Sequence, residues 1–532
     1  MALLILLLII ELSTGTPEER VIQASELESI IRGGGPAEFD DRTILGDLNL
    51  SGLVIKQPVH FNSTIFKNSV TFNSTTFKGD AYFRSSTYNG DAYFESSTYN
   101  GDTIFRNSTY NGTADFRGST YNGDTSFRNS TYNGDADFEG STYNGIAYFW
   151  GSIYNGDAYF WDSTYNDDAS FGGSTYNDDA HFGDSTYNDT AGFEESTYNG
   201  TANFVGSTYN GTADFWCSTY NDIAYFWYST YNDDADFGGS TYNGTANFVG
   251  STYNGIAYFE YSTYNGDAYF GGSTYNGIAD FWYSTYNGDA YFVEDTFDKK
   301  INFNDVALKK NISFNSSQFN GDALVENTTI QGKLSLTKTK YGKLFIRWYN
   351  IKGGLVYDDA AYMSLMKNFK DLGYFEDYDS CYFQYRKEHR GQPWPAVNDL
   401  EEGARKLIDY PLEWFYGYGT KPFNAFLWSL SIIITFFIYW WWLGLGGPKD
   451  KTKESLKDGE EWLDGDATDV LGFSVTVFLS GTKFFIDPPA MPKIEGRSRS
   501  WIKKAFILER VLGGLFSVLF FIAISGTIVR AT

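Results

Sequence analysis

The feature that most limits what this chain can fold into is an eleven-residue period. The repeating unit reads STYNGDADFEG with variants, and its tyrosine recurs at every eleventh position from Tyr88 to Tyr286. Its phenylalanine recurs with the same step from Phe83 to Phe292, and no insertion breaks the phase between Leu50 and Tyr341. Because loops tolerate changes of length, an unbroken phase predicts coils that stack residue over residue in a solenoid.

Small and large residues alternate within each unit. Serine stands two positions before each tyrosine and alanine two positions before most phenylalanines, with one residue between them. This period-2 alternation predicts very short strands whose large residues point inward. Asn-Gly follows most of the tyrosines, and we expect it to form a turn because both residues tolerate positive φ. Two eleven-residue units would then complete a square coil, and residues 50–345 would form about thirteen coils.

The A-D-F and S-T-Y triplets resemble those of the pentapeptide-repeat family, whose members form right-handed quadrilateral β-helices. This chain differs by adding one residue, usually Asp or Thr after Asn-Gly, to alternate pentads. The resemblance implies an all-β right-handed quadrilateral β-helix over residues 50–345. It implies almost nothing about function, because one fold can carry many functions.

Nearly all charged residues of the repeats are acidic. The net charge of the chain is −26, and no lysine or arginine occurs between Asn129 and Asp298. Such a surface repels phosphate backbones and anionic headgroups, so we expect no nucleic-acid partner. Acidic pentapeptide-repeat rods can imitate DNA, but that function needs a cytoplasmic location, which the membrane segments described below argue against.

Two sets of repeat residues are candidates for binding. The first set follows inward phenylalanines and is therefore expected to point outward, where it would bind sugar or a partner surface, or be decoration without function: Trp150, Trp161, Trp216, Trp227 and Trp282. The second set consists of aspartates after Asn-Gly, which could bind calcium: Asp91, Asp102 and Asp135. We favour a turn role for these aspartates, because Thr or Ile often fills the same position.

Little in the chain supports catalysis or a cofactor. The three histidines lie in separate regions, and no nucleotide-binding loop or nucleophile motif is found. The two cysteines, Cys217 and Cys381, suggest neither a disulfide framework nor a zinc site. We therefore expect no enzyme activity, no metal and no cofactor.

The segments that flank the repeats differ from them in composition. Residues 1–15 contain an apolar run too short to span a bilayer and resemble a signal peptide, although a positive n-region is missing. Residues 16–49 are expected to cap the solenoid with a short helix that ends at Gly-Gly-Gly-Pro. Residues 356–410 have helical spacing with a break at Gly373, which predicts a helical hairpin.

The C-terminal region, 411–532, is predicted to lie in a membrane. Uncharged stretches at 423–443 and 511–529 are long enough to span. A shorter apolar segment at 470–486 suits a re-entrant loop between them. A span, a re-entrant segment and a second span form the architecture of a pore subunit.

This region resembles the pore of two-transmembrane potassium channels. Phe473-Ser474-Val475-Thr476, then Phe478 and Pro488, are similar to the family's S-V-T-T-F-T-T-V-G-Y-G-D-I-x-P segment. The V-G-Y-G-D filter is replaced by Gly481-Thr482-Lys483-Phe484-Phe485, which places a positive charge where a cation would pass. The resemblance implies that a set of residues lines or frames a pore made by four chains: Thr476, Ser480, Gly481, Thr482, Lys483, Phe484 and Phe485.

The distribution of charge predicts the orientation of the chain. Most of the basic residues near the spans lie between them, including Lys449, Lys457 and Lys503, which predicts a cytoplasmic inter-span loop. A multi-pass membrane location with the repeats outside the cytoplasm follows. Glycosylation sequons such as Asn62-Ser63-Thr64 and Asn199-Gly200-Thr201 fit that side, although a repeat rich in Asn and Thr produces sequons by composition alone.

Two functions stay open. In the first, a surface or scaffold rod is held in the lipid bilayer by a pore-like module with a degenerate filter, and the solenoid binds a cell-surface or protein ligand. In the second, the chain is an ion channel, potassium-channel-like and tetrameric, whose solenoid is a sensor or vestibule. Both predict a bilayer as partner, and a homo-oligomer is expected.

Overall fold

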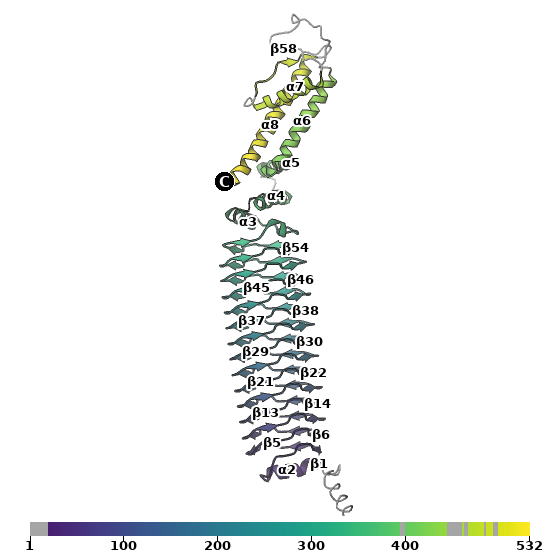
Figure 1. Ribbon diagram of the computed structural model, residues 1–532, viewed down its shortest axis with the longest axis vertical. Coiled ribbons are helices and arrows are strands. Elements are labelled where there is room, and N and C mark those ends of the chain that lie inside the picture. Colours follow the sequence, from purple (N-terminus) through teal and green to yellow (C-terminus); the bar gives the residue numbers. More distant parts are fainter. Residues whose placement is uncertain are drawn as a thin grey trace, which may run out of the picture. The chain divides into compact units, whose positions relative to one another are not determined.

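The structure is a computed structural model that falls into two compact units, residues 1–361 and 362–532 (Figure 1). It describes the following residues: 20–393, 400–443, 460–461, 466–482, 486–492 and 498–531. The predicted signal peptide at 1–15 lies outside the described residues. The first unit is a four-sided parallel β-solenoid, and the second is mainly helical.

Each side of the solenoid is one parallel sheet. From β4 (Val54–Ile55) to β56 (Lys340–Tyr341) every strand has two residues, and successive strands start alternately five and six residues apart. Each strand pairs with the strand one full coil further along. In the pairing of β10 (Thr87–Tyr88) with β14 (Thr109–Tyr110), for example, Tyr88 lies opposite Tyr110. The predicted coil of two eleven-residue units is therefore confirmed.

The solenoid has more coils than the predicted thirteen, with 15 strands in one sheet and 14 in each of the other three. Pairing begins before residue 50, because β1 (Val21–Gln23), β2 (Thr43–Leu45) and β3 (Leu48–Asn49) already belong to the sheets. It ends after β57 (Leu344–Phe345), where single bridges join Ile330 to Ile351 and Leu334 to Leu355.

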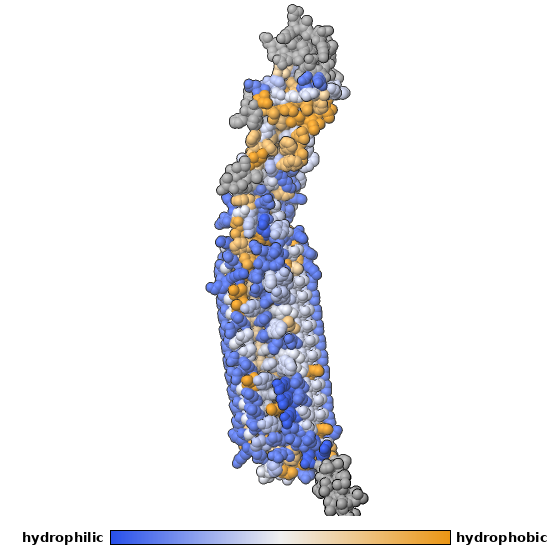
Figure 2. Space-filling view, in the orientation of Figure 1, coloured by the Kyte–Doolittle hydropathy of each residue, from blue (hydrophilic) through white to orange (hydrophobic). Residues whose placement is uncertain are grey.

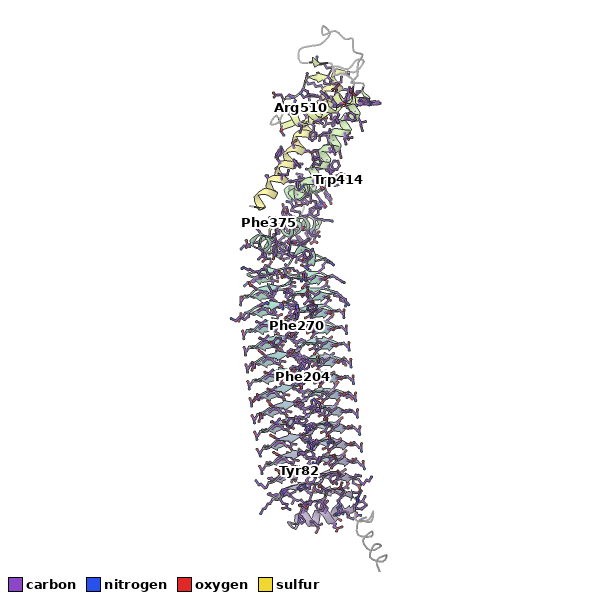
Figure 3. The ribbon with its side chains drawn as sticks, viewed as in Figure 1. Tyr82, Phe204, Phe270, Phe375, Trp414 and Arg510 are labelled. Atoms are coloured by element: carbon purple, nitrogen blue, oxygen red, sulfur yellow. The ribbon has the colours of Figure 1, made fainter. Side chains whose placement is uncertain are left out.

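The interior of the solenoid consists of stacked aromatic columns. Phe105 and Phe127 lie 5.0 Å apart and 3° from parallel, and Tyr110 and Tyr132 lie 4.8 Å apart and 1° from parallel. These distances match the spacing of about 4.8 Å between neighbouring strands, so one ring per coil fills the column. Phe204 and Phe270, which belong to one such column, are labelled inside the solenoid in Figure 3.

The buried serine before each tyrosine links neighbouring coils. Ser108 Oγ accepts the backbone N–H of Ser86 at 3.2 Å and lies 3.0 Å from the carbonyl oxygen of Phe83, to which it donates. The same arrangement recurs along the column, as Ser130 shows with Ser108 and Phe105. Serine is therefore small enough to fit inside the coil and polar enough to satisfy the backbone at the corner.

The turn prediction was wrong about which residues take positive φ. Within residues 20–393, every eleventh residue from Asp41 to Lys338 has φ between 53° and 72°, and this position is the second after each inward phenylalanine or its equivalent. The Asn-Gly pairs of the repeats do not have positive φ. Their glycine serves close stacking instead, since a Cβ on Gly90 would lie 2.7 Å from the carbonyl carbon of Asn68.

A short helix, α2 (Ala24–Arg32), covers the first coil at the position where the sequence predicts one. Its Ala24, Leu27 and Ile31 are buried. Arg32 donates to the carbonyl oxygen of Asn49, and Asn49 N–H donates to Glu28. These contacts close the open end of the solenoid.

The second unit contains these elements: α3 (Asp359–Asp371, which begins just before the unit boundary), α4 (Phe375–Gly391), α5 (Leu400–Tyr416), η3 (Gly417–Gly419), α6 (Pro422–Trp442), β58 (Glu460–Glu461), α7 (Ala467–Leu479), η5 (Ser480–Thr482), β59 (Met491–Pro492) and α8 (Arg499–Ala531). Gly373, with φ +75°, separates α3 from α4 where the sequence predicts a break. A further 3-10 turn, η2 (Trp348–Asn350), belongs to the first unit.

Two helices are long and apolar enough to cross a membrane, at residues 422–442 and 499–525. The first agrees with the predicted span 423–443. The second begins well before the predicted Val511, because Glu509 and Arg510 interrupt the uncharged run in the sequence but not the helix. The segment predicted as re-entrant is the short helix α7 followed by the single turn η5.

Candidate functional site

A buried carboxylate joins the three apolar helices of the second unit. Glu509 of α8 is fully buried, and Trp440 Nε1 of α6 donates to its Oε2 at 2.7 Å. Ser474 of α7 contacts its other oxygen, Oε1, and also lies 3.0 Å from the carbonyl oxygen of Ile433. One carboxyl group of α8 therefore binds both α6 and α7.

An apolar cluster surrounds these polar contacts. Trp440 packs with residues of α7 and α8, among them Phe473, Val477 and Phe506. The rings of Trp440 and Phe473 lie 5.7 Å apart and nearly perpendicular. The sequence did not reveal Glu509, because its partners are 35 and 69 residues away along the chain. The feature of the sequence that could have indicated this site is a single acidic residue inside a long apolar stretch.

The end of α7 and the turn η5 that follows it pack directly on the backbone of α8. A Cβ on Gly513 would lie 2.0 Å from the carbonyl oxygen of Phe478, and one on Gly481 would lie 2.2 Å from that of Arg510. Glycine is therefore needed on both sides of the contact. Gly481, predicted as a pore residue, has a packing role in this chain.

The other predicted pore residues are only partly described. Ser480 is buried and donates to the carbonyl oxygen of Val477 at 2.8 Å. Thr476 donates to the carbonyl oxygen of Gly472 at 2.7 Å, within its own helix, and Thr482 ends η5. The remaining three, Lys483, Phe484 and Phe485, lie outside the described residues.

The five predicted tryptophans lie on two corners of the solenoid. Trp150, Trp216 and Trp282 follow strands of one sheet: β21 (Ala147–Tyr148), β33 (Ala213–Asp214) and β45 (Ala279–Asp280). Trp161 and Trp227 follow strands of another sheet: β23 (Ala158–Tyr159) and β35 (Ala224–Tyr225). Trp150, Trp161 and Trp216 are exposed, whereas Trp227 and Trp282 are half-buried.

The predicted calcium candidates connect neighbouring coils. Asp91 Oδ1 accepts the backbone N–H of Thr113 at 3.0 Å, and its Oδ2 accepts the hydroxyl of Tyr93. Asp102 and Asp135 accept the backbone N–H of Asp124 and Asp157 in the same way. These contacts support the turn role rather than the metal role. A different group, Asp167, Asp168 and Asp189, brings its carboxylates within 4.8 Å of one another, but all three are exposed.

Acidic groups beside the tryptophans have altered acidity. Burial raises the pKa of Asp214, two residues before Trp216, to about 6, although backbone N–H donation from Trp216 opposes this. Burial also raises the pKa of Glu260 to about 7, and the charges of Asp236 and Asp280 add to the effect. These carboxylates therefore lie in partly dehydrated positions on the solenoid surface.

Part of the repeat region matches a known family model. A family model described as pentapeptide repeats (9 copies) matches residues 61–109 and 111–153. The structure continues the same register beyond that stretch to Tyr341. No curated protein and no solved structure matches the chain. The resemblance of the helical unit to two-transmembrane channels stays a prediction.

Proposed function

We propose that this pentapeptide-repeat chain is a membrane protein whose helical unit lies in a bilayer and whose solenoid is a binding surface. The observation that carries the proposal is the outward direction of apolar side chains on α6 and α8. On α6 these exposed residues include Phe423, Leu430, Ile434 and Ile438, and on α8 they include Val511, Leu515 and Val518. Figure 2 shows hydrophobic residues gathered over this unit and a mainly hydrophilic solenoid.

Exposure to water would be unfavourable for such a surface. Each large apolar side chain left in water forgoes about 1.5–3 kcal/mol of burial free energy, whereas a lipid environment recovers it. Glu509 instead faces the interior of the helical unit, where Trp440 and Ser474 bind it. Apolar residues outside and a bonded carboxylate inside are typical of membrane helices. We further propose that the solenoid lies outside the cytoplasm, as the basic inter-span residues predict.

The test is co-flotation of the full-length protein with lipid vesicles in a density gradient. We expect the wild-type protein to float and to resist extraction at high pH. The double variant Leu430→Lys and Ile434→Lys should lose both properties, because it places two charges on the outward face of α6. Thr175→Lys on the solenoid is the control and should float. A wild-type protein that stays soluble without detergent and does not float would overturn the proposal.

A second candidate function is ion conduction, favoured by the placement of α7. This apolar helix has 13 residues, too few to span, and it packs between two membrane-length helices. The exposed faces of α6 and α8 could then also contact further copies of the chain. K⁺, Na⁺ and Cl⁻ flux into liposomes tests this function, with a chain truncated before Phe423 as control. Flux that requires the helical unit and is altered in the Lys483→Ala variant would support a channel. The absence of flux in a folded, oriented preparation would exclude ion conduction.

A further inference from the structure

We propose that one edge of the solenoid binds a linear polysaccharide without acidic groups, along its tryptophan corner. This inference rests on the proposed role of the solenoid as a binding surface and names its ligand class. We call one column of residues the tryptophan corner. Its members come shortly after the strands of one sheet, with one residue in each coil: Trp150, Gly172, Glu194, Trp216, Gly238, Glu260 and Trp282.

The tryptophan corner has a longer period than the solenoid itself. Trp, Gly and Glu alternate in fixed order, so each tryptophan recurs after three coils. With coils about 4.8 Å apart, the indoles recur about every 14 Å along a straight edge. A polymer whose own units repeat along one line can contact each indole in the same way. A single compact ligand would contact only one of these three indoles at a time.

The glycines leave room for the neighbouring side chains to lie along the edge. A Cβ on Gly172 would lie 2.7 Å from Cδ of Glu194, and a Cβ on Gly238 would lie 3.5 Å from Cδ of Glu260. A Cβ on Gly173 would lie 2.9 Å from Nε1 of Trp150. A larger residue at Gly172 would displace the Glu194 side chain and one at Gly173 would displace the Trp150 indole, whereas at Gly238 the contact with the Glu260 side chain would be an ordinary one. Within the column, each interval between two tryptophans therefore holds one glycine and one glutamate.

The exposed groups suit a sugar chain. The indoles of Trp150 and Trp216 are 46% and 37% exposed, and flat aromatic faces of this kind pack against the C–H face of a sugar ring. The Oε2 atoms of Glu194 and Glu260 lie buried beneath the surface of the corner and have no hydrogen-bond partner in the described structure. A hydroxyl or amino group of a bound sugar supplies the missing donor once the carboxylate rotates toward it.

Two tyrosines widen the aromatic surface at Trp282. Tyr261 and Tyr283 are stacked 5.7 Å apart, and the Tyr261 ring lies 5.1 Å from the Trp282 ring. Both tyrosines have φ of 57°, a conformation that is strained for a bulky residue. In other coils Gly, Ser, Asn, Asp or Glu commonly fills this position. Two exposed aromatic side chains thus occupy positions that local backbone preference disfavours.

Charge restricts which polysaccharide can bind. No lysine or arginine lies between Asn129 and Asp298, which includes the whole tryptophan corner. Acidic polysaccharides and nucleic acids are therefore repelled. A neutral chain meets no repulsion, and an amino-substituted chain gains attraction from Glu194 and Glu260.

The opposite set of tryptophans provides a matched control. Trp161 and Trp227 are also three coils apart, but the residues between them in the column are Gly183 and Val205, so this column itself contains no carboxylate. We expect binding to depend on the tryptophan corner and not on this second column. The two sets can be removed separately in the same protein.

The experiment measures binding of full-length protein in detergent to cellohexaose and to a chitosan oligomer, with alginate and polylysine as comparison probes. We expect wild type to bind cellohexaose or chitosan but not alginate. The triple variant Trp150→Ala, Trp216→Ala and Trp282→Ala should weaken binding at least about tenfold. The double variant Trp161→Ala and Trp227→Ala should leave it unchanged within about twofold. Far-ultraviolet circular dichroism checks that both variants keep the solenoid.

Three results would overturn the inference: no binding of either sugar chain, equal losses in the two sets of variants, or binding of polylysine alone. Failure of the polysaccharide inference can be distinguished from failure of the membrane proposal. A protein that floats with vesicles but binds no sugar contradicts only the polysaccharide inference. A protein that binds sugar but does not float contradicts only the membrane proposal.

Discussion

Asp295 occupies a position in the solenoid that serine fills in the neighbouring coils. Its Oδ1 accepts the backbone N–H of Ser273 at 2.7 Å, and its own N–H donates to Ser317 Oγ at 3.0 Å. Its second oxygen, Oδ2, is buried and has no hydrogen-bond partner in the described structure. Burial raises the pKa of Asp295 well above its ordinary value, and hydrogen bonding from Ser273 only partly opposes this.

Replacement of Asp295 by serine is expected to stabilise the solenoid by about 1–3 kcal/mol at pH 7. Because the folded protein holds the Asp295 proton more tightly than the unfolded chain, wild-type stability falls as pH rises above the ordinary aspartate range, near pKa 3.9. The advantage of Asp295→Ser should therefore be large at pH 7 and small at pH 4. Thermal unfolding of the full-length protein, followed by circular dichroism, measures both.

The control for this prediction is Glu294→Ser, which removes a neighbouring carboxylate that is exposed. It should shift the unfolding temperature little at either pH, because an exposed carboxylate is hydrated in both states. An advantage of Asp295→Ser that is the same at pH 4 and pH 7 would contradict burial of the charge as its cause.

Glu509 supports a second prediction at the scale of single residues. Glu509→Ala should destabilise the helical unit by about 2 kcal/mol or more, because it removes the acceptor of Trp440 Nε1 and leaves space between three helices. Glu509→Gln keeps the side-chain shape and two polar atoms, so it should retain most of the stability. Thermal unfolding in detergent measures the stability of both variants. Equal losses of stability in Glu509→Ala and Glu509→Gln would show that the shape and polarity of the side chain at this position do not matter.

At the scale of elements, the contact between η5 and α8 depends on backbone approach. In Gly513→Ala the added Cβ would meet the carbonyl oxygen of Phe478 at 2.0 Å, so the end of α7 would have to move. We expect a loss of stability beyond about 2 kcal/mol, on the scale of overpacking. Thermal unfolding in detergent provides the measurement.

Gly472 provides the matched control, because it lies within α7 and a Cβ there would meet no atom within 4 Å. Gly472→Ala should stabilise α7 by about 0.5–1 kcal/mol through helix propensity. Loss of stability in Gly472→Ala as large as in Gly513→Ala would mean that the backbone contact is not the cause.

The sequence predicted elements best where one pattern repeats. Strand positions and the register between coils follow from the spacing of tyrosine and phenylalanine, because these inward residues occupy the same positions in every coil. The position of positive φ was missed, since Asn-Gly is a turn signal whose glycine is used here for close stacking. The Glu509 contacts could not be foreseen, because no pattern links residues of three helices that are far apart in the chain.

At the scale of the whole molecule, the solenoid should tolerate removal of one complete coil. Deletion of residues 160–181 removes such a coil and joins equivalent positions, so every aromatic column stays in phase. Deletion of 160–167 would place polar residues in those columns and should abolish folding of the adjacent coils. Circular dichroism and size-exclusion chromatography of the two full-length variants distinguish these outcomes. Equal behaviour of the two deletions would contradict the stacking of coils in register.

The near-identity of successive coils also affects how the gene can change. Misaligned recombination between two copies inserts or removes one or more eleven-residue units, and the protein that results keeps its aromatic columns because each unit supplies one inward tyrosine and one inward phenylalanine. Lineages that share this gene are therefore expected to differ in solenoid length by multiples of eleven residues rather than by single residues. The order of Trp, Gly and Glu along the tryptophan corner is itself what duplication of a three-coil block would leave behind.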